Sequence, residues 1–177
     1  MALDPKTLLC EAKALQEELV TLRRDLHAHP ELGSCEVRTT ALIKTYLEEL
    51  SIEVRPCTET GVLGILYGGK PGKTIGLRAD IDALPIQEET GLPFASKNAG
   101  VMHACGHDLH TASLMGAAKI LSAHRDALCG NVKFFFQTKK AMAVRSAWSG
   151  PAACKTQMWT LFSAGTAAPA ESPAIMV

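Results

Sequence analysis

Segments with a helical spacing of apolar residues alternate with short strand-like segments along the first 137 residues of the chain. Helices are expected at residues 4–26, 34–50 and 109–128. Strands are expected at residues 52–55, 62–67, 74–79 and 131–137. This alternation predicts an α/β fold in which helices pack on the faces of a sheet.

Local sequence signals indicate where these elements begin and end. Asp4 can cap the first helix, Ser34 the second and Asp108 the third, because short polar side chains accept hydrogen bonds from the free N–H groups of a first helical turn. The glycine-rich residues 68–72 predict a hairpin-like break between two strands. The connection at residues 80–104 is long for a compact domain, and connections of that length often carry function.

The composition excludes several functional classes. Apolar residues make up 47% of the chain and charged residues 20%, which is typical of a globular domain. The formal net charge is zero, so no basic surface indicates a nucleic-acid partner. No apolar run approaches the roughly 20 residues that span a bilayer, so no membrane partner is expected. Without a secretory signal or a disulfide-like cysteine pattern, a cytoplasmic protein with reduced thiols is expected.

The character of the sequence changes near residue 138. From there to residue 177 the only acidic residue is Glu171, and both tryptophans of the chain occur in this segment. No persistent helical or strand period is present there. The sequence therefore predicts two parts, residues 1–137 with the α/β pattern and residues 138–177 as a divergent tail. A shifted reading frame or a disordered segment would explain the tail.

Residues 103–110, with the sequence HACGHDLH, hold the densest group of potential metal ligands in the chain. Thiolate and imidazole are preferred ligands of zinc and of its neighbours in the first transition series. Gly106 separates Cys105 from His107, so the backbone can turn there and direct both side chains at one ion. Cys105 and His107 are therefore the main ligand candidates.

A structural interpretation of the same residues competes with metal binding. Asp108 would then cap a helix and the histidines would be solvated. The close packing of several potential ligands in one short segment favours the metal. His103 and His110 are the weaker ligand candidates, and His110 is expected to pack in the first helical turn or to support the site.

Two carboxylates, Asp80 and Asp82, follow the strand expected at residues 74–79. At the C-terminal edge of a sheet they would lie in the crevice where α/β proteins bind ligands. One of them could orient a metal-bound imidazole or tune a catalytic base. Taken alone, however, the pair is better explained by capping of the strand end and an ion pair with Arg78.

His27 and His29 form a further pair near the end of the first expected helix. Two histidines in this spacing can chelate a metal ion. Histidines also favour helix C-termini because the helix dipole stabilises their positive charge there. The structural interpretation is preferred for this pair.

Three strings of the sequence together resemble one family: LRRDLHAHPELG at residues 22–33, GLRADIDALPIQEETGLPFASKNAGVMHACGHDLHTASLMGAA at residues 76–118, and NVKFFFQ at residues 131–137. They are similar to the metal-dependent aminoacylase and carboxypeptidase family of amidohydrolases. This family includes hippurate hydrolase, N-acyl-amino-acid amidohydrolases, indole-acetyl-amino-acid hydrolases and N-acetyldiaminopimelate deacetylases. The resemblance covers about residues 15–137, an N-terminal part of such a protein.

The resemblance implies a partial catalytic domain of a metallo-aminopeptidase-like fold, with a mixed sheet flanked by helices and a smaller inserted domain in the family. It implies a divalent metal cofactor (Zn, Mn, Co or Ni) and a small N-acyl amino acid or peptide as substrate, in proteins that are often homo-oligomeric. Matched residue by residue, Cys105 and His107 correspond to the first two metal ligands. Asp82, and with less support Asp80, correspond to the catalytic acidic position at the strand end.

The sequence departs from the family pattern after residue 137. The family continues with Pro-Ala-Glu-Glu, which supplies the general base and a metal ligand, whereas this chain continues with Thr138, Lys139 and Lys140. No histidine occurs after His124, although the family takes two further ligands from downstream histidines. The general-base glutamate is therefore absent, and the expectation is an amidohydrolase that is truncated and inactive as this chain.

Two alternatives remain beside the amidohydrolase. One is a non-catalytic fragment that binds a metal ion, and the other, less favoured, is a thiol protein with Cys105 as its nucleophile. A sheet cut after residue 137 would also expose an apolar edge strand, and such edges favour aggregation.

Overall fold

The structure, a computed structural model, describes residues 4–138 of the chain. Its elements are the helices and strands α1 (Pro5–Ala14), α2 (Gln16–Ala28), α3 (Val37–Glu49), β1 (Glu53–Pro56), β2 (Val62–Tyr67), β3 (Lys70–Asp80), α4 (His107–Ala123), a 3-10 turn (Arg125–Ala127) and β4 (Cys129–Gln137). The predicted α/β class is confirmed, and the predicted order of helices and strands is found.

The described strands form one mixed sheet with the order β1-β2-β4-β3. β4 pairs in parallel with β3 and antiparallel with β2, and β1 pairs antiparallel with β2. The predicted hairpin-like break at residues 68–72 is wrong, because β4 lies between β2 and β3. β4 is also an inner strand rather than an exposed edge, so the edges within residues 4–138 are β1 and β3.

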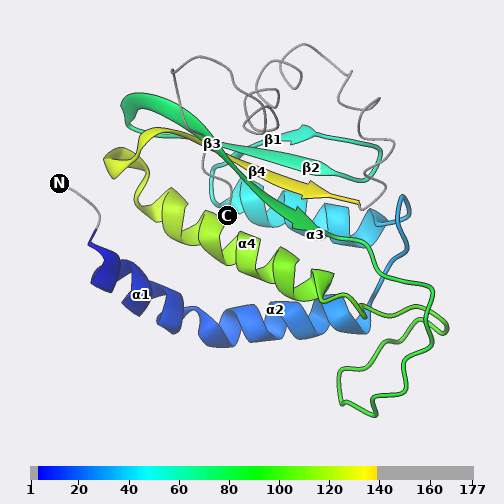
Figure 1. Ribbon diagram of the computed structural model, residues 1–177. Coiled ribbons are helices and arrows are strands. Elements are labelled where there is room, and N and C mark those ends of the chain that lie inside the picture. Colours follow the sequence, from blue (N-terminus) through cyan, green and yellow to red (C-terminus); the bar gives the residue numbers. More distant parts are fainter. Residues whose placement is uncertain (1–3, 139–177) are drawn as a thin grey trace, which may run out of the picture.

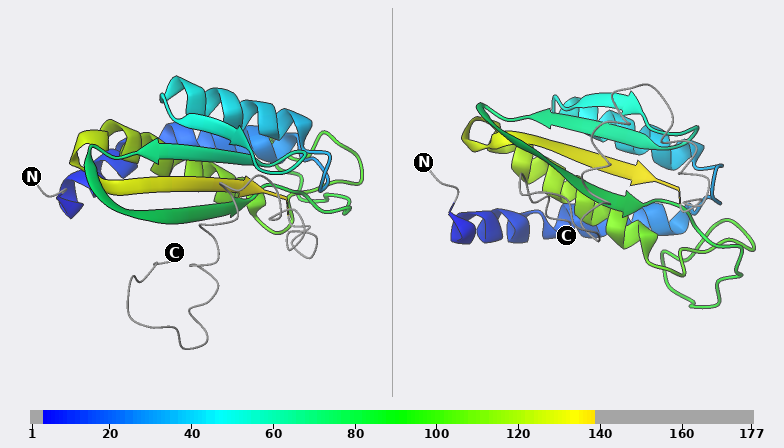
Figure 2. Two further views of the ribbon diagram at one scale, coloured as in Figure 1. Left: turned by 90° about the horizontal axis from the view of Figure 1, so that it is seen from above. Right: turned by 45° about the horizontal axis from the view of Figure 1, so that its top comes forward.

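The described helices lie on one face of this sheet, as Figures 1 and 2 show. α3 and α4 pack directly on the strands, while α1 and α2 pack on the outer side of α4. The core between helices and sheet includes the fully buried residues Phe134, Phe136, Ile43, Leu47 and Met115. β4 carries three consecutive phenylalanines, and the side chain of Phe135 packs on the opposite face with Leu63 and Ile65.

The helix boundaries differ from the sequence expectation at several points, one of which is the end of α4 at Ala123 instead of near residue 128. The helix expected at residues 4–26 is interrupted at Leu15, which keeps a right-handed helical backbone, and it runs on to Ala28.

Ser34 does not cap α3; it has a φ of +70° and Glu36 stands at the N-cap position. Asp108 does not cap α4 either, because α4 begins at His107 and its N-cap is Gly106. Asp4 does cap α1, by accepting from the N–H groups of Lys6 and Thr7.

Gly130 allows β3 and β4 to approach closely where β4 begins. Its φ is +93°, and a Cβ atom at this position would lie 1.9 Å from the carbonyl oxygen of Lys73. The register of the β3–β4 pair shifts at the same place, between Lys70 and Thr74. Beyond this irregularity the two strands run in register to their common end, which positions the site described next.

Among residues 4–138, none of the helices combines the length and the apolar character needed to cross a bilayer. The divergent tail expected at residues 138–177 lies outside the described residues except for Thr138.

Candidate metal centre

The C-terminal ends of the parallel strands β3 and β4 meet at one edge of the sheet, and α4 begins beside them. Asp80 is in register with Gln137, and the N–H of Ile81 donates to the carbonyl oxygen of Gln137 at 3.0 Å. Figure 1 shows both arrowheads pointing to this edge, where the long connection to α4 leaves the sheet. Asp80 and Asp82 therefore lie at the C-terminal edge, as the strand pattern predicts.

His107, the first residue of α4, is held against Asp82, which lies two positions after the end of β3. Its Nδ1 atom lies 2.7 Å from the carbonyl oxygen of Asp82 and 3.1 Å from the carboxylate Oδ1 of Asp82. A hydrogen on Nδ1 that is donated to Asp82 leaves the lone pair of Nε2 free to bind. Metal-ligating histidines commonly use their second nitrogen in this way. His107 therefore has the arrangement of an oriented ligand.

Cys105 supplies the second donor of the candidate site. It is an exposed, free cysteine two residues before His107. Gly106 between them has a φ of +75°, so the backbone turns at the glycine, as predicted. Among residues 4–138, however, His, Cys, Asp and Glu side chains do not converge in groups of three or more that could hold a metal ion. The described part of the chain thus presents two candidate ligands rather than a complete centre.

The two carboxylates at the strand end have different surroundings. The guanidinium of Arg78 lies 2.5 Å from Asp80 Oδ1, so the structural interpretation fits Asp80. Asp82 is 7% exposed and contacts His107 through its carboxylate. The orientation of a ligand by a carboxylate is therefore a role that the geometry offers to Asp82 rather than to Asp80.

The two weaker histidine candidates also differ. His110 is exposed and its ring stacks on that of His107, with 5.6 Å between the ring centroids. His103 is 4% exposed, and neither of its ring nitrogens has a hydrogen-bond partner among the described residues. Burial lowers the pKa of His103 to about 4, so its ring is neutral at pH 7.

A buried charged cluster lies behind the candidate ligands, and the sequence pattern does not single it out. Asp108 contacts both Arg23 and His27, and His27 also contacts Glu88. The structural interpretation of His27 agrees with this cluster. The partners stand 61 to 85 residues apart in the chain, so no local motif reports them. The one available signal is the four-residue spacing of Arg23 and His27, which places both on one face of a helix.

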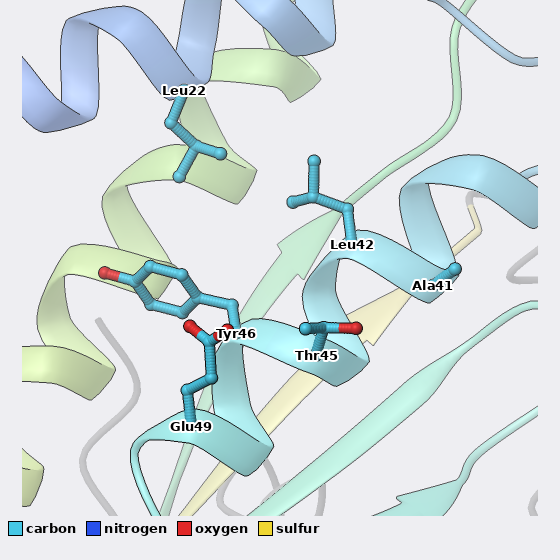
Figure 3. Close-up of a pocket in the computed structure, with 6 residues that line it drawn as sticks. All are labelled: Leu22, Ala41, Leu42, Thr45, Tyr46 and Glu49. Carbon is cyan, nitrogen blue, oxygen red and sulfur yellow. The ribbon is translucent and has the colours of Figure 1, made fainter.

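A pocket of about 390 Å³ lies apart from this region, between α2 and α3. Figure 3 shows its lining residues, which are Leu22 from α2 and Ala41, Leu42, Thr45, Tyr46 and Glu49 from α3. Burial, followed by the nearby carboxylate of Glu18, raises the pKa of Tyr46 above its ordinary value. None of the candidate metal ligands lines this pocket, so it is not part of the candidate centre.

Comparison with known proteins gives close matches. Residues 76–139 match the model of peptidase family M20/M25/M40. The chain is 53% identical over 133 residues to the N-acetylcysteine deacetylase of Bacillus subtilis (strain 168), across 74% of this chain and 35% of that protein. It is 48% identical over 133 residues to the N-acyl-L-amino acid amidohydrolase of Geobacillus stearothermophilus, across 75% of this chain and 35% of that protein.

A solved structure agrees with these matches. The crystal structure of a Bacillus subtilis protein described as a dinuclear metal-binding peptidase of the M20 family is 50% identical, with a TM-score of 0.72. The superposition covers 77% of this chain and 40% of that one. The chain spans about a third of the length of the curated relatives it matches. Sequence and fold point to the same conclusion: the chain belongs to the peptidase M20/M25/M40 family and corresponds to an N-terminal part of such a protein.

Proposed function

We propose that this chain carries the first two ligands of a divalent metal centre in an amidohydrolase that cleaves the amide bond of N-acyl amino acids. Cys105 and His107 are the proposed ligands, and Asp82 is the proposed supporting carboxylate, with a lesser role for Asp80. The observation that carries the proposal is the contact of His107 Nδ1 with Asp82, which leaves Nε2 free on a histidine two residues after an exposed thiol. The relatives named as a deacetylase and an amidohydrolase support the reaction class.

The donor set fits a divalent transition metal in part. One thiolate and one imidazole suit Zn, Co or Ni better than Mn, which prefers oxygen ligands, and a catalytic ion usually has three protein ligands. The remaining ligands are not among the residues that converge here within residues 4–138. When bound, such an ion lowers the pKa of a coordinated water to near 7 and polarises the substrate carbonyl. A ligand thiol must stay reduced, which suits a cytoplasmic protein.

The residues after β4 argue that this chain binds metal without turnover. Resemblance to the family implies two glutamates shortly after Gln137, one as general base, and the sequence has Lys139 and Lys140 about there. A protonated lysine cannot accept a proton from water. Loss of a general base alone costs about 10²–10⁴ in rate. The second candidate function is therefore a non-catalytic metal-binding fragment, which the two proposed ligands and the lysines at about the position of the family's glutamates favour.

Titration with Co²⁺ tests the proposed ligands directly. The purified chain is expected to show a sulfur-to-metal charge-transfer band that Cys105→Ser abolishes and His107→Ala weakens strongly. Cys10→Ser removes another exposed free thiol, in α1, and is expected to leave the band unchanged. If Cys105→Ser binds Co²⁺ with the same spectrum as the parent chain, the ligand assignment is wrong.

Hydrolysis assays test whether this chain can turn over substrate. With Zn²⁺, Mn²⁺ or Co²⁺ added, hippurate and N-acetyl amino acids are expected to remain intact, because this chain does not turn them over. Clear metal-dependent hydrolysis would show that a base and further ligands are present, and would remove the non-catalytic alternative. Hydrolysis that needs no metal but is blocked by a thiol reagent would contradict both functions.

A further inference from the structure

A cluster of four side chains, those of Arg23, His27, Glu88 and Asp108, ties α2, α4 and the connection between β3 and α4 together. Asp108 Oδ2 accepts from Nε of Arg23 at 2.7 Å and from Nδ1 of His27 at 2.8 Å. The other ring nitrogen of His27, Nε2, lies 3.2 Å from Oε1 of Glu88. The side chains of Asp108, Glu88 and His27 are 0%, 2% and 4% exposed, and only that of Arg23 reaches solvent, at 33%.

The cluster pairs buried carboxylates with Arg23 and His27, while Oδ1 of Asp108 has no hydrogen-bond partner among the described residues. Both nitrogens of His27 face carboxylates, which can only accept, so both contacts are hydrogen bonds when the ring carries a hydrogen on each nitrogen. Buried charges are costly unless they are paired, so the position of each of the three segments depends on the other two.

The connection is fastened to the end of α2 by this cluster and by its backbone. Glu88 also accepts the N–H of Ser96 at 2.6 Å, which closes the connection on itself. The N–H of Lys97 donates to the carbonyl of Ala28 at 2.9 Å, and the side chain of Asn98 donates to the carbonyl of Pro30 at 2.7 Å. Figure 1 shows this connection extending beyond the neighbouring ends of α2 and α4.

The first turn of α4 is consequently held from two sides. Asp108 joins it to α2, while the preceding residue, His107, joins it to Asp82 at the strand end. Gly106 supplies no side chain and a left-handed backbone just before this turn, so local sequence alone constrains the turn weakly. The orientation of His107 therefore depends on the anchor that Asp108 provides.

We propose that Asp108 is a positioning residue of the metal centre, which acts through the Arg23–His27–Glu88 cluster to fix the first turn of α4 and thus the aim of His107 and Cys105. This inference rests on the proposed function for its consequence in metal binding. The anchoring itself is a property of the fold and can be tested without metal.

Two substitutions of one residue separate the two contacts of His27. His27→Asn places an amide nitrogen near the position of Nδ1 and keeps the hydrogen bond to Asp108, whereas His27→Gln places it near the position of Nε2 and keeps the contact with Glu88. Both variants replace the imidazole with a carboxamide, so a difference between them reports which contact matters. His124→Asn is the matched control, since it removes a histidine–carboxylate contact, with Glu11, at the other end of α4.

Co²⁺ binding and amide exchange are measured on the full chain and its three variants. His27→Gln is expected to weaken Co²⁺ binding about 10-fold or more and to shift the thiolate charge-transfer band, as losses behind a ligand typically do. His27→Asn and His124→Asn are expected to stay within about twofold of the parent chain, since the contact with Asp108 is kept or untouched. Equal Co²⁺ affinities and spectra for His27→Asn and His27→Gln would overturn the proposal.

Amide exchange decides the anchoring even if the parent chain shows no Cys105-dependent band, an outcome that would refute the proposed function. The N–H groups of Leu109 and His110 bond to the carbonyl of Gly106 in this first turn. They are expected to exchange faster in His27→Gln than in His27→Asn, at equal global stability. Equal exchange rates in the two variants would show that Asp108 does not fix the turn.

Discussion

The imidazole of His107 meets both the main-chain carbonyl and the carboxylate of Asp82, at 2.7 and 3.1 Å from Nδ1. The carbonyl contact survives any substitution at position 82, while the carboxylate contact does not. The backbone can therefore keep the ring near its place, and the carboxylate adds the charge that raises the basicity of a ligand imidazole.

Replacement of this carboxylate should weaken metal binding without unfolding the chain. Asp82→Asn is expected to lower Co²⁺ affinity by about 10- to 100-fold, the range observed for partners of metal-bound histidines. Asp80→Asn removes a carboxylate that pairs with the partly exposed Arg78 and is expected to change affinity by no more than about twofold. Equal losses of Co²⁺ affinity in the two variants would mean that the negative charge at this edge of the sheet, rather than the contact with His107, controls binding.

Gly106 should be needed for its backbone conformation. Gly106→Ala places a Cβ atom on a residue with a φ of +75°, which costs about 1–2 kcal/mol of folding stability. Open space surrounds this position, so the loss should come from the backbone and not from a clash. Gly106→Asn is expected to lose less, because asparagine tolerates the left-handed region. Urea unfolding of the three chains measures the differences, and a larger loss for asparagine than for alanine would contradict this explanation.

Gly130 and Gly91 allow steric overlap to be separated from backbone strain. Both have a positive φ, but a Cβ atom at Gly91 meets nothing within 4 Å, whereas one at Gly130 would lie 1.9 Å from Lys73 O. Gly91→Ala is therefore expected to cost about 1–2 kcal/mol, from strain alone. Gly130→Ala is expected to cost at least about 2 kcal/mol more, since the β3–β4 pair must move apart. Similar unfolding free energies for the two variants would show that the strands yield easily at this point.

Glu88 should make stability depend on acid pH. Burial alone would raise its pKa, but hydrogen bonds from the Thr90 hydroxyl, the Ser96 N–H and His27 outweigh burial and lower the pKa below its ordinary value of 4.5. A lowered folded-state pKa means that the stabilisation is present above pH 4.5 and is lost as the pH falls through the folded-state pKa.

The corresponding measurement compares the parent chain with Glu88→Gln by urea unfolding between pH 7 and pH 3. The parent chain is expected to have the larger free energy of unfolding at pH 7. The difference in this free energy between the two chains should narrow on acidification, because glutamine has no proton to gain. A gap that stays constant across this range would assign the effect of the substitution to packing rather than to charge.

Much of the fold could be predicted because its signals are local. The apolar spacing of α3 and α4, the three phenylalanines of β4 and the turn at Gly106 each report their own structure. Strand neighbours are not a local property, so the glycines within residues 68–72 predict a hairpin-like break although β4 inserts between β2 and β3. Nothing within those residues encodes the strand that arrives from residue 129 onward.

The candidate site divides in the same way. The chemistry of Cys105 and His107 and the position of Asp82 at a strand end follow from residue type and order. The proposed role of Asp108 could not be predicted in this way. An aspartate at the start of a helix is usually a cap, and only the structure shows that Asp108 contacts α2 through His27. Asp80 and Asp82 look alike in sequence. The three-dimensional structure shows that Asp80 pairs with Arg78 and that Asp82 contacts His107.

The contact between His27 and Asp108 joins residues 81 positions apart. The loop that presents Cys105 and His107 is therefore ordered when the whole α/β unit closes, not when a cation arrives. A short peptide copied from residues 100–112 would lose conformational entropy on binding a cation, and its affinity for the cation would be lower for that reason. In this chain folding orders the segment that carries the two proposed ligands, so the entropy of ordering them would not reduce the affinity for a cation.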